Sequence, residues 1–280
     1  MAFHEWPLVL FTVFAQTAVG AFLIMSLTNL VIDSRVGVKD KITRNMFFVW
    51  VLMGLGFMAS TAHLGSPMRA MNALNQVGSS WLSNEILTGS LFFAFGGFYW
   101  LLDVLKKGPE GLRKVLMVLG MIAGVAFMYS MVNVYLINTV PTWDTPYTWW
   151  SFLLTMLVSG SLFALILIHS AQFDNAKYSR AIQAVVVVGV IAMIVMTLGQ
   201  MAALADINSS VVAASDLVVN MGCLQGIRIV LIIAGSAIAL ACFRREKSNL
   251  AIALVGFAMV FFAELLGRTI FFNLHMTVGM

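Results

Sequence analysis

A histidine, an arginine and a glutamate lie close together between two apolar runs of this 280-residue chain. They are His63, Arg69 and Glu85 in the stretch ASTAHLGSPMRAMNALNQVGSSWLSNE. An imidazole group titrates near neutral pH and can accept a proton, and a carboxylate can pass that proton on to water. Because only 10% of the residues are charged, this placement at the ends of two apolar runs predicts proton-transfer chemistry.

The same three side chains also have structural interpretations. His63 precedes Leu-Gly-Ser-Pro, which ends helices, and an imidazolium group suits the C-terminal end of a helix dipole. Glu85 follows a Ser and an Asn and suits a helix N-terminus. Arg69 suits a contact with lipid headgroups or with a partner protein. The sequence leaves both interpretations open.

A second group of ionisable side chains lies near the C-terminus. Glu264 and Arg268 have the i,i+4 spacing that favours an ion pair on one helix. His275 follows about three turns after Glu264 and would continue the same face if the helix extends that far. We expect one stripe with an acid, a base and an imidazole, or a structural ion pair that neutralises two buried charges.

The apolar content of the chain indicates a membrane protein. Hydrophobic residues make up 61% of it, and the mean hydropathy is +0.95. Apolar helices of about 18 or more residues can cross the hydrocarbon core, and helices satisfy their own backbone hydrogen bonds there. We therefore expect one all-α domain over residues 1–280, a polytopic membrane bundle of eight transmembrane helices. The expected spans are 7–32, 46–64, 85–105, 113–137, 148–171, 181–205, 226–243 and 249–273.

Basic residues are concentrated in alternate loops. Of the 16 Lys and Arg residues, 13 fall in the segments 33–45, 106–114, 172–180 and 244–248. The positive-inside rule places these loops in the cytoplasm and both termini outside. The net charge of +4 therefore reflects membrane orientation and does not indicate a nucleic-acid partner.

This topology places the ionisable residues of both groups near the outer face. Charged groups in a membrane are costly, at about 2.5–3.5 kcal/mol each at the helix centre, so they indicate function. A lipid-soluble quinol fits such a site, because its oxidation releases two protons near an interface. Its electrons must then leave on a partner redox subunit, since two cysteines, Cys223 and Cys242, are too few for an iron–sulfur cluster. The same two cysteines lie too far apart along one predicted helix to form a disulfide.

Two other classes of protein remain as alternatives. A haem between helices commonly needs two histidines at matching depth, and here His63 and His275 share the outer end but both lie near loops. A small-molecule transporter would be expected to have internal repeats, broken helices and a polar site at the midplane. The sequence has no recognisable repeat and almost no ionisable residue at the midplane.

Four segments resemble the membrane-anchor subunit of anaerobic dimethyl sulfoxide reductase, the DmsC family. They are HEWPLVLFTVFAQTAVG near the N-terminus, WVLMGLGFMASTAHLGSPMRAMNALNQVGSSWLSNEI around the second span, VNVYLINTVPTW after the fourth, and AELLGRTIFFNLHMTVGM at the C-terminus. Together they are distributed over the length of the sequence.

The resemblance implies a multi-pass subunit of the bacterial inner membrane that oxidises menaquinol to menaquinone. Electrons would pass to an iron–sulfur subunit and then to a molybdenum-pterin catalytic subunit, both on the periplasmic side, with no haem and no metal on this subunit. The family motifs place a menaquinol-linked histidine at His63 and a glutamate at Glu85.

The remaining candidates complete the expected site. Arg69 would contact the quinol or orient the 65–84 loop against the iron–sulfur subunit, and Glu264, Arg268 and His275 would form the opposite wall. An anchor for a related S- or N-oxide or oxyanion reductase is the alternative within this class.

Overall fold

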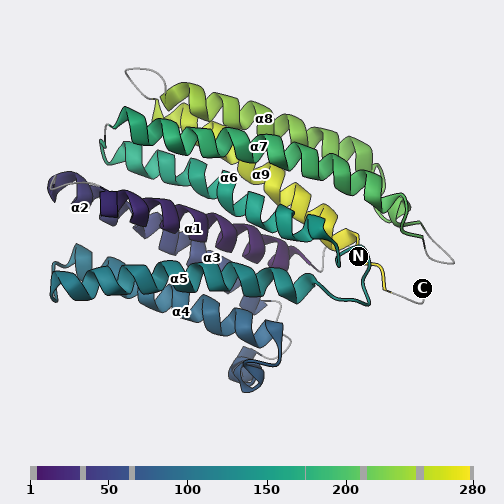
Figure 1. Cartoon of the computed structure of the whole chain (residues 1–280), viewed down its shortest axis with the longest axis horizontal. Coiled ribbons are helices and arrows are strands. Elements are labelled where there is room, and N and C mark those ends of the chain that lie inside the picture. Colours follow the sequence, from purple (N-terminus) through teal and green to yellow (C-terminus); the bar gives the residue numbers. More distant parts are fainter. Residues whose placement is uncertain are drawn as a thin grey trace.

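The structure is a computed structural model that describes residues 5–31, 36–62, 67–173, 175–208, 213–243 and 249–277. Over these residues the chain forms α-helices joined by short turns and two 3₁₀ helices (Figure 1). The elements are α1 Trp6–Val31, α2 Val36–Asn45, α3 Phe47–Ala62, η1 Pro67–Gln76, α4 Trp81–Val104, α5 Glu110–Tyr135, α6 Pro146–Ser170, α7 Ala176–Leu204, η2 Ala214–Asp216, α8 Met221–Phe243 and α9 Leu250–Asn273.

Eight helical segments in the described ranges are long and apolar enough to cross a membrane. Seven of them are single helices, and the eighth is the run Gly37–Ala62, which combines most of α2 with α3. The predicted all-α bundle of eight spans is therefore confirmed as a fold. Three helices begin at least one turn earlier than predicted, α4 at Trp81, α7 at Ala176 and α8 at Met221.

The prediction of a loop over 33–45 is wrong for most of that segment, because α2 occupies Val36–Asn45. Ile42 of this helix is completely buried, as is the adjoining Met46. Asn45 Nδ2 donates hydrogen bonds to the Leu167 carbonyl and to Ser170 Oγ, both at 2.8 Å, and so fixes α2 on the C-terminal end of α6. A short amphipathic helix of this kind is too polar to be found by mean hydropathy.

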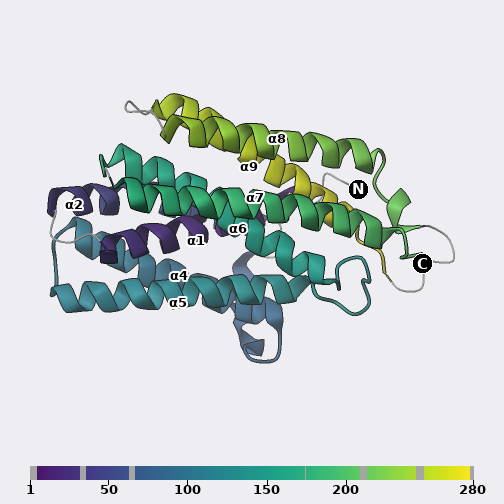
Figure 2. The same ribbon diagram turned by 45° about the horizontal axis from the view of Figure 1, so that its top comes forward.

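The helices form two halves that meet along α1 and α6 (Figures 1 and 2). In the first half α1 packs on α3, and α4 packs on α5; in the second half α6 packs on α7, and α8 packs on α9. The first helix of each half also packs on the last, α1 on α5 and α6 on α9. The packing order thus repeats, although the sequence shows no recognisable repeat. The most buried spans are α1 and α6, at 72% and 78%, so these two helices form the centre.

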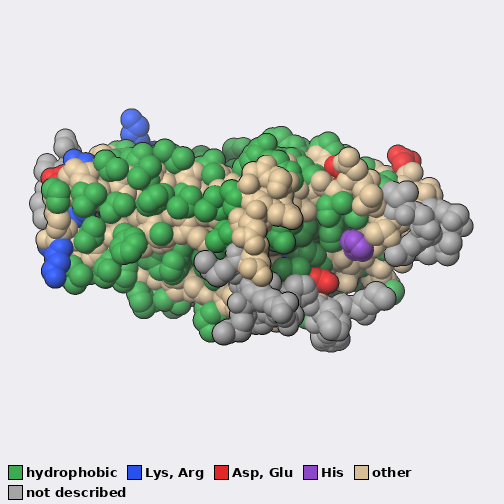
Figure 3. Space-filling model, turned by 90° about the horizontal axis from the view of Figure 1, so that it is seen from below, with side chains coloured by type: hydrophobic (Ala, Val, Ile, Leu, Met, Phe, Trp, Pro, Cys, Tyr) green, Lys and Arg blue, Asp and Glu red, His purple; other side chains and the backbone are tan. Residues whose placement is uncertain are grey.

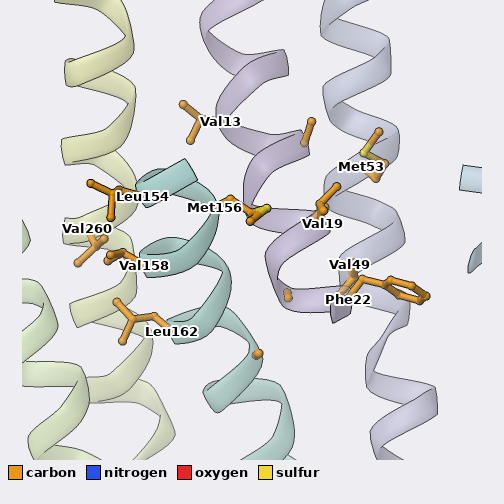
Figure 4. Packing of buried hydrophobic residues seen from close by; sticks show 14 of the residues in the cluster. Val13, Val19, Phe22, Val49, Met53, Leu154, Met156, Val158, Leu162 and Val260 are labelled. Carbon is orange, nitrogen blue, oxygen red and sulfur yellow. The ribbon is translucent and has the colours of Figure 1, made fainter. Parts of the chain in front are cut away.

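The central pair of helices meets in backbone contact. A Cβ atom on Gly160 of α6 would lie 2.6 Å from Gly20 Cα of α1, so neither position has room for a larger side chain. Small residues let membrane helices approach closely, and this approach increases their van der Waals contact. Fully buried Val13, Val158 and other apolar side chains fill the space along the same pair (Figure 4).

Basic side chains are concentrated at one end of the bundle. The first and last described residues lie at one end, and the turns that join α4 to α5 and α6 to α7 lie at the other (Figure 1). At that second end Arg113 pairs with Asp103 at 2.9 Å. On the face shown in Figure 3, Lys and Arg side chains lie at this end beside an acidic side chain, and a histidine and further acidic side chains lie toward the opposite end. The membrane side that each end faces stays a prediction.

We expect Gly160→Val to destabilise the bundle strongly, because its side chain would force α1 and α6 apart, and overpacking of this kind costs about 1–3 kcal/mol or more. The matched control is Gly97→Val on α4, where an added Cβ meets nothing within 4 Å. Thermal melting of the two variants in detergent, followed by size-exclusion chromatography, makes the comparison. Equal melting temperatures for both variants would contradict the close α1–α6 contact.

Candidate functional site

Glu85 lies on the buried face of α4 and one turn inside the helix. The same face carries Gly89, Phe92 and Gly96, which pack against α5 and α1. The side chain of Glu85 is 4% exposed, and its Oε1 has no hydrogen-bond partner within the described residues. Buried polar groups are normally satisfied, so an unpartnered carboxyl oxygen in a membrane span marks a place where an additional group can bind.

The surroundings of Glu85 converge on Tyr135, at the C-terminal end of α5. Glu85, Arg268 and Glu5 all lie within electrostatic range of the Tyr135 hydroxyl group. The ring of Tyr135 packs edge-on against Trp143 and other aromatic side chains, with the Tyr135 and Trp143 centroids 5.7 Å apart. The N-terminal ends of α1 and α4 and the C-terminal parts of α5 and α9 therefore meet around this tyrosine.

Arg268 of α9 is held in the interior by a hydrogen bond and a ring contact. Its side chain is 3% exposed, and Nη2 donates to Gln16 Oε1 of α1 at 2.9 Å. The guanidinium carbon lies 3.6 Å from the centroid of the Phe152 ring of α6, a cation–π contact. Nε and Nη1 have no partner among the described residues, so Arg268 retains donor capacity in this region.

The predicted ion pair between Glu264 and Arg268 is wrong, because Glu264 pairs with a different arginine. Arg228 Nη2 of α8 lies 3.6 Å from Glu264 Oε2, and Thr155 Oγ1 donates to the same oxygen at 2.5 Å. Arg228 fits there because Gly267 has no side chain, and a Cβ at that position would lie 2.4 Å from Arg228 Nε. The i,i+4 rule describes a solvated helix surface, whereas here the neighbouring helix decides the pairing.

His275 does not continue the face of α9. The helix ends at Asn273, and the His275 side chain is exposed, with its ring centroid 4.7 Å from that of Trp143. The side chains of the two remaining predicted residues, Arg69 and His63, are not described. Arg69 belongs to η1, but its side chain is not described, and His63 lies outside the described residues.

A groove of about 520 Å³ lies between the N-terminal end of α4 and the C-terminal end of α5. Ser80, Trp81 and Leu82 line it from α4 and its preceding turn, and Asn133 and Asn138 line it from the end of α5 and the following turn. Trp81 and Leu82 are 43% and 53% exposed, so this wall of the groove lies at the surface of the bundle. Glu85 is one helical turn deeper on α4.

Sequence reasoning missed three members of this cluster. Gln16 and Thr155 are ordinary polar residues within apolar runs, and nothing in their sequence context distinguishes them. Arg228 did give a signal, because an arginine within an apolar span is rare. Within the described part of the chain, no group of three or more His, Cys, Asp or Glu side chains could hold a metal ion. Cys223 is exposed and Cys242 is buried, and the two are not joined by a disulfide.

These features define a multi-pass membrane subunit that keeps ionisable groups buried near one end of its bundle. Comparison with known proteins gives the family. Residues 1–274 match the family model described as DMSO reductase anchor subunit (DmsC). The protein belongs to this family and is the membrane-anchor subunit of an anaerobic dimethyl sulfoxide reductase complex.

Three relatives support this assignment over the full length. The sequence is 42% identical to the YnfH subunit of an anaerobic dimethyl sulfoxide reductase of Escherichia coli, and 43% identical to the C subunit of the anaerobic dimethyl sulfoxide reductase of the same organism. It is 38% identical to the corresponding C subunit of Haemophilus influenzae. Each match covers 99% of this sequence and 97% of the relative, so the similarity also includes the second half of the bundle.

We expect Arg228→Met to destabilise the protein by about 3–5 kcal/mol, because it leaves the Glu264 carboxylate buried without its cation. The double variant Arg228→Met with Glu264→Gln should regain most of this loss, since Gln can still accept from Thr155. A double-mutant cycle by thermal or denaturant unfolding in detergent measures the coupling.

The matched control for this cycle is the exposed pair of Lys114 and Glu110, at 2.8 Å. Lys114→Met should cause no measurable change, because water solvates both charges. If the double variant were as unstable as the sum of its single variants, the Arg228–Glu264 pair would not be a coupled unit.

Proposed function

We propose that this subunit oxidises menaquinol at the end of the bundle where Glu85 lies, and that this end faces the periplasm. The observation that carries the proposal is the buried, unpartnered Oε1 of Glu85, one helical turn along α4 from Trp81, which lines an open groove. Oxidation of the quinol releases two protons and two electrons, so the site needs a proton acceptor and a route for electrons. The positive-inside distribution of Lys and Arg supports the orientation.

His63 and Glu85 divide the proton chemistry in this proposal. His63 accepts a hydrogen bond from one quinol hydroxyl group and takes its proton, because an imidazole titrates near neutral pH. Glu85 provides the second hydrogen bond or passes the proton outward to water. The DmsC-family motifs that contain these two residues support the assignment of both roles.

The remaining candidate residues surround this pair. Arg69 contacts the quinol or orients its loop against the iron–sulfur subunit. Glu264, Arg268 and His275 form the opposite wall, and Arg268 lies within electrostatic range of the Tyr135 hydroxyl group. The unpartnered Nε and Nη1 of Arg268 support a role as hydrogen-bond donor on this wall.

Electrons leave the site through partner subunits. In the proposed complex an iron–sulfur subunit docks at the periplasmic end and passes electrons to a molybdenum-pterin catalytic subunit, which reduces dimethyl sulfoxide. The identity of the terminal S-oxide, N-oxide or oxyanion is then decided on that partner. Residues 1–280 act as one integral unit of the bacterial inner membrane.

We expect Glu85→Gln to lower menaquinol-driven turnover of the assembled complex by roughly 10- to 100-fold, because the amide cannot carry the proton. Turnover with a reduced dye that donates directly to the partner subunits should be unchanged. Steady-state rates with both donors give the comparison.

The matched control for this experiment is Asp103→Asn. Asp103 lies on the same buried face of α4 at its opposite end, where it pairs with Arg113. This variant should keep both activities. Equal loss of menaquinol-driven turnover in the two variants would show that any buried acid has this effect, and it would contradict the assignment of Glu85 to the menaquinol site.

We expect His63→Ala to lower menaquinol-driven turnover by about 100-fold, because the proposed proton acceptor is removed. His63→Gln, which retains hydrogen bonding without a titratable group, should restore quinol binding but not the rate. The KM and kcat for menaquinol separate these effects. Unchanged kcat in His63→Ala, within a fully assembled complex, would refute the role of His63.

A further inference from the structure

A second groove lies at the opposite end of the bundle, away from Glu85. It has a volume of about 600 Å³ and is lined by the C-terminal ends of α6 and α8 and by the first three turns of α7. The basic segment 172–180 of the sequence ends here, and its two basic residues, Lys177 and Arg180, lie on the first turns of α7. No residue of the proposed quinol site lines this groove.

The part of this groove beside the first turns of α7 is polar and contains the cationic side chain of Arg180. Arg180 is exposed there, and its Nε donates only to the Ala176 carbonyl of its own helix, at 3.1 Å. Arg180 forms no ion pair with a carboxylate in the part of the chain that the structure describes. Ser179 and Gln183 line the groove beside it, and the positive end of the α7 dipole lies at the same place.

The part of the groove further along α7 is apolar, and its α7 side chains are exposed at the surface. Val187 and Val188 continue the same helix and are 41% and 66% exposed. Phe243 of α8 lines the facing wall, and its ring centroid lies 4.3 Å from that of His169. The groove therefore changes from polar to apolar within about two turns of α7, as a lipid molecule does between its headgroup and its acyl tails.

We propose that this groove binds one anionic phospholipid, with its headgroup phosphate at Arg180 and an acyl tail along Val187 and Val188. Arg180 matches the phosphate in charge and can donate two hydrogen bonds to it. The exposed valines match an acyl tail and would contact lipid wherever α7 faces the bilayer. A soluble anion would satisfy Arg180 but leave the apolar wall without an occupant.

The experiment uses the complete complex, purified in mild detergent and depleted of lipid. Phosphatidylglycerol is titrated into it, and the apparent affinity is obtained from the increase in melting temperature and from lipid adducts in native mass spectrometry. We expect Arg180→Ala to weaken the affinity about fivefold, the effect of one basic residue near an anionic lipid surface. Arg180→Lys should restore most of the affinity.

The matched control is Lys177→Ala, which removes the same charge from the same helix at an exposed position outside the groove. It should bind phosphatidylglycerol like the unmodified protein. Equal weakening by Lys177→Ala and Arg180→Ala would overturn the proposal in favour of general charge attraction. Equal protection by phosphatidylcholine or by inorganic phosphate would overturn it as well, since the groove would then recognise only a lipid surface or only an ion.

Discussion

An ionisable group buried in the membrane is costly unless it has a partner inside the bundle, and the packing of the helices around Glu264 and Arg268 depends on this constraint. Glu264 meets it with Arg228 and Thr155, and Arg268 meets it with Gln16 and the Phe152 ring. These contacts connect α1, α6, α8 and α9. They therefore hold the two halves of the protein together at the end where the proposed chemistry takes place.

Glu85 differs from the other buried charged groups because it is not part of this pairing. Its side chain makes no hydrogen bond or ion pair with another described residue, although Tyr135 lies within electrostatic range. A carboxyl group without a partner destabilises an apolar bundle, and in the proposed function the bound quinol completes its hydrogen bonding. The paired cluster gives rigidity, and the proposal assigns the chemistry to the unpaired carboxyl group. The two halves share one packing order, but the unpartnered carboxyl group of Glu85 lies in the first half and the paired carboxyl group of Glu264 lies in the second.

The sequence was sufficient for the number of spans and for the position of Glu85 near one end of the bundle, because both depend on depth in the membrane, whereas the role of Glu85 stays a prediction. Hydropathy measures whether a segment is apolar enough to span, and alternate basic loops determine the end at which each residue lies. It was not sufficient for α2, whose ten residues are polar on average and fold by docking on the end of α6. The partner of Glu264 also depends on packing, since Gly267 admits Arg228 from the neighbouring helix. His275 was misplaced because the end of α9 was extrapolated beyond Asn273.

The most direct test of the account is photoaffinity labelling of the intact complex with a menaquinone analogue that carries a photoreactive group on its ring. Peptide mass spectrometry would then locate the label. The account predicts labelling of the first turns of α4, around Glu85, and of the end of α5, around Tyr135, with competition by unlabelled menaquinone. Competed labelling confined to the end of the bundle that holds Arg113 and Arg180 would contradict it.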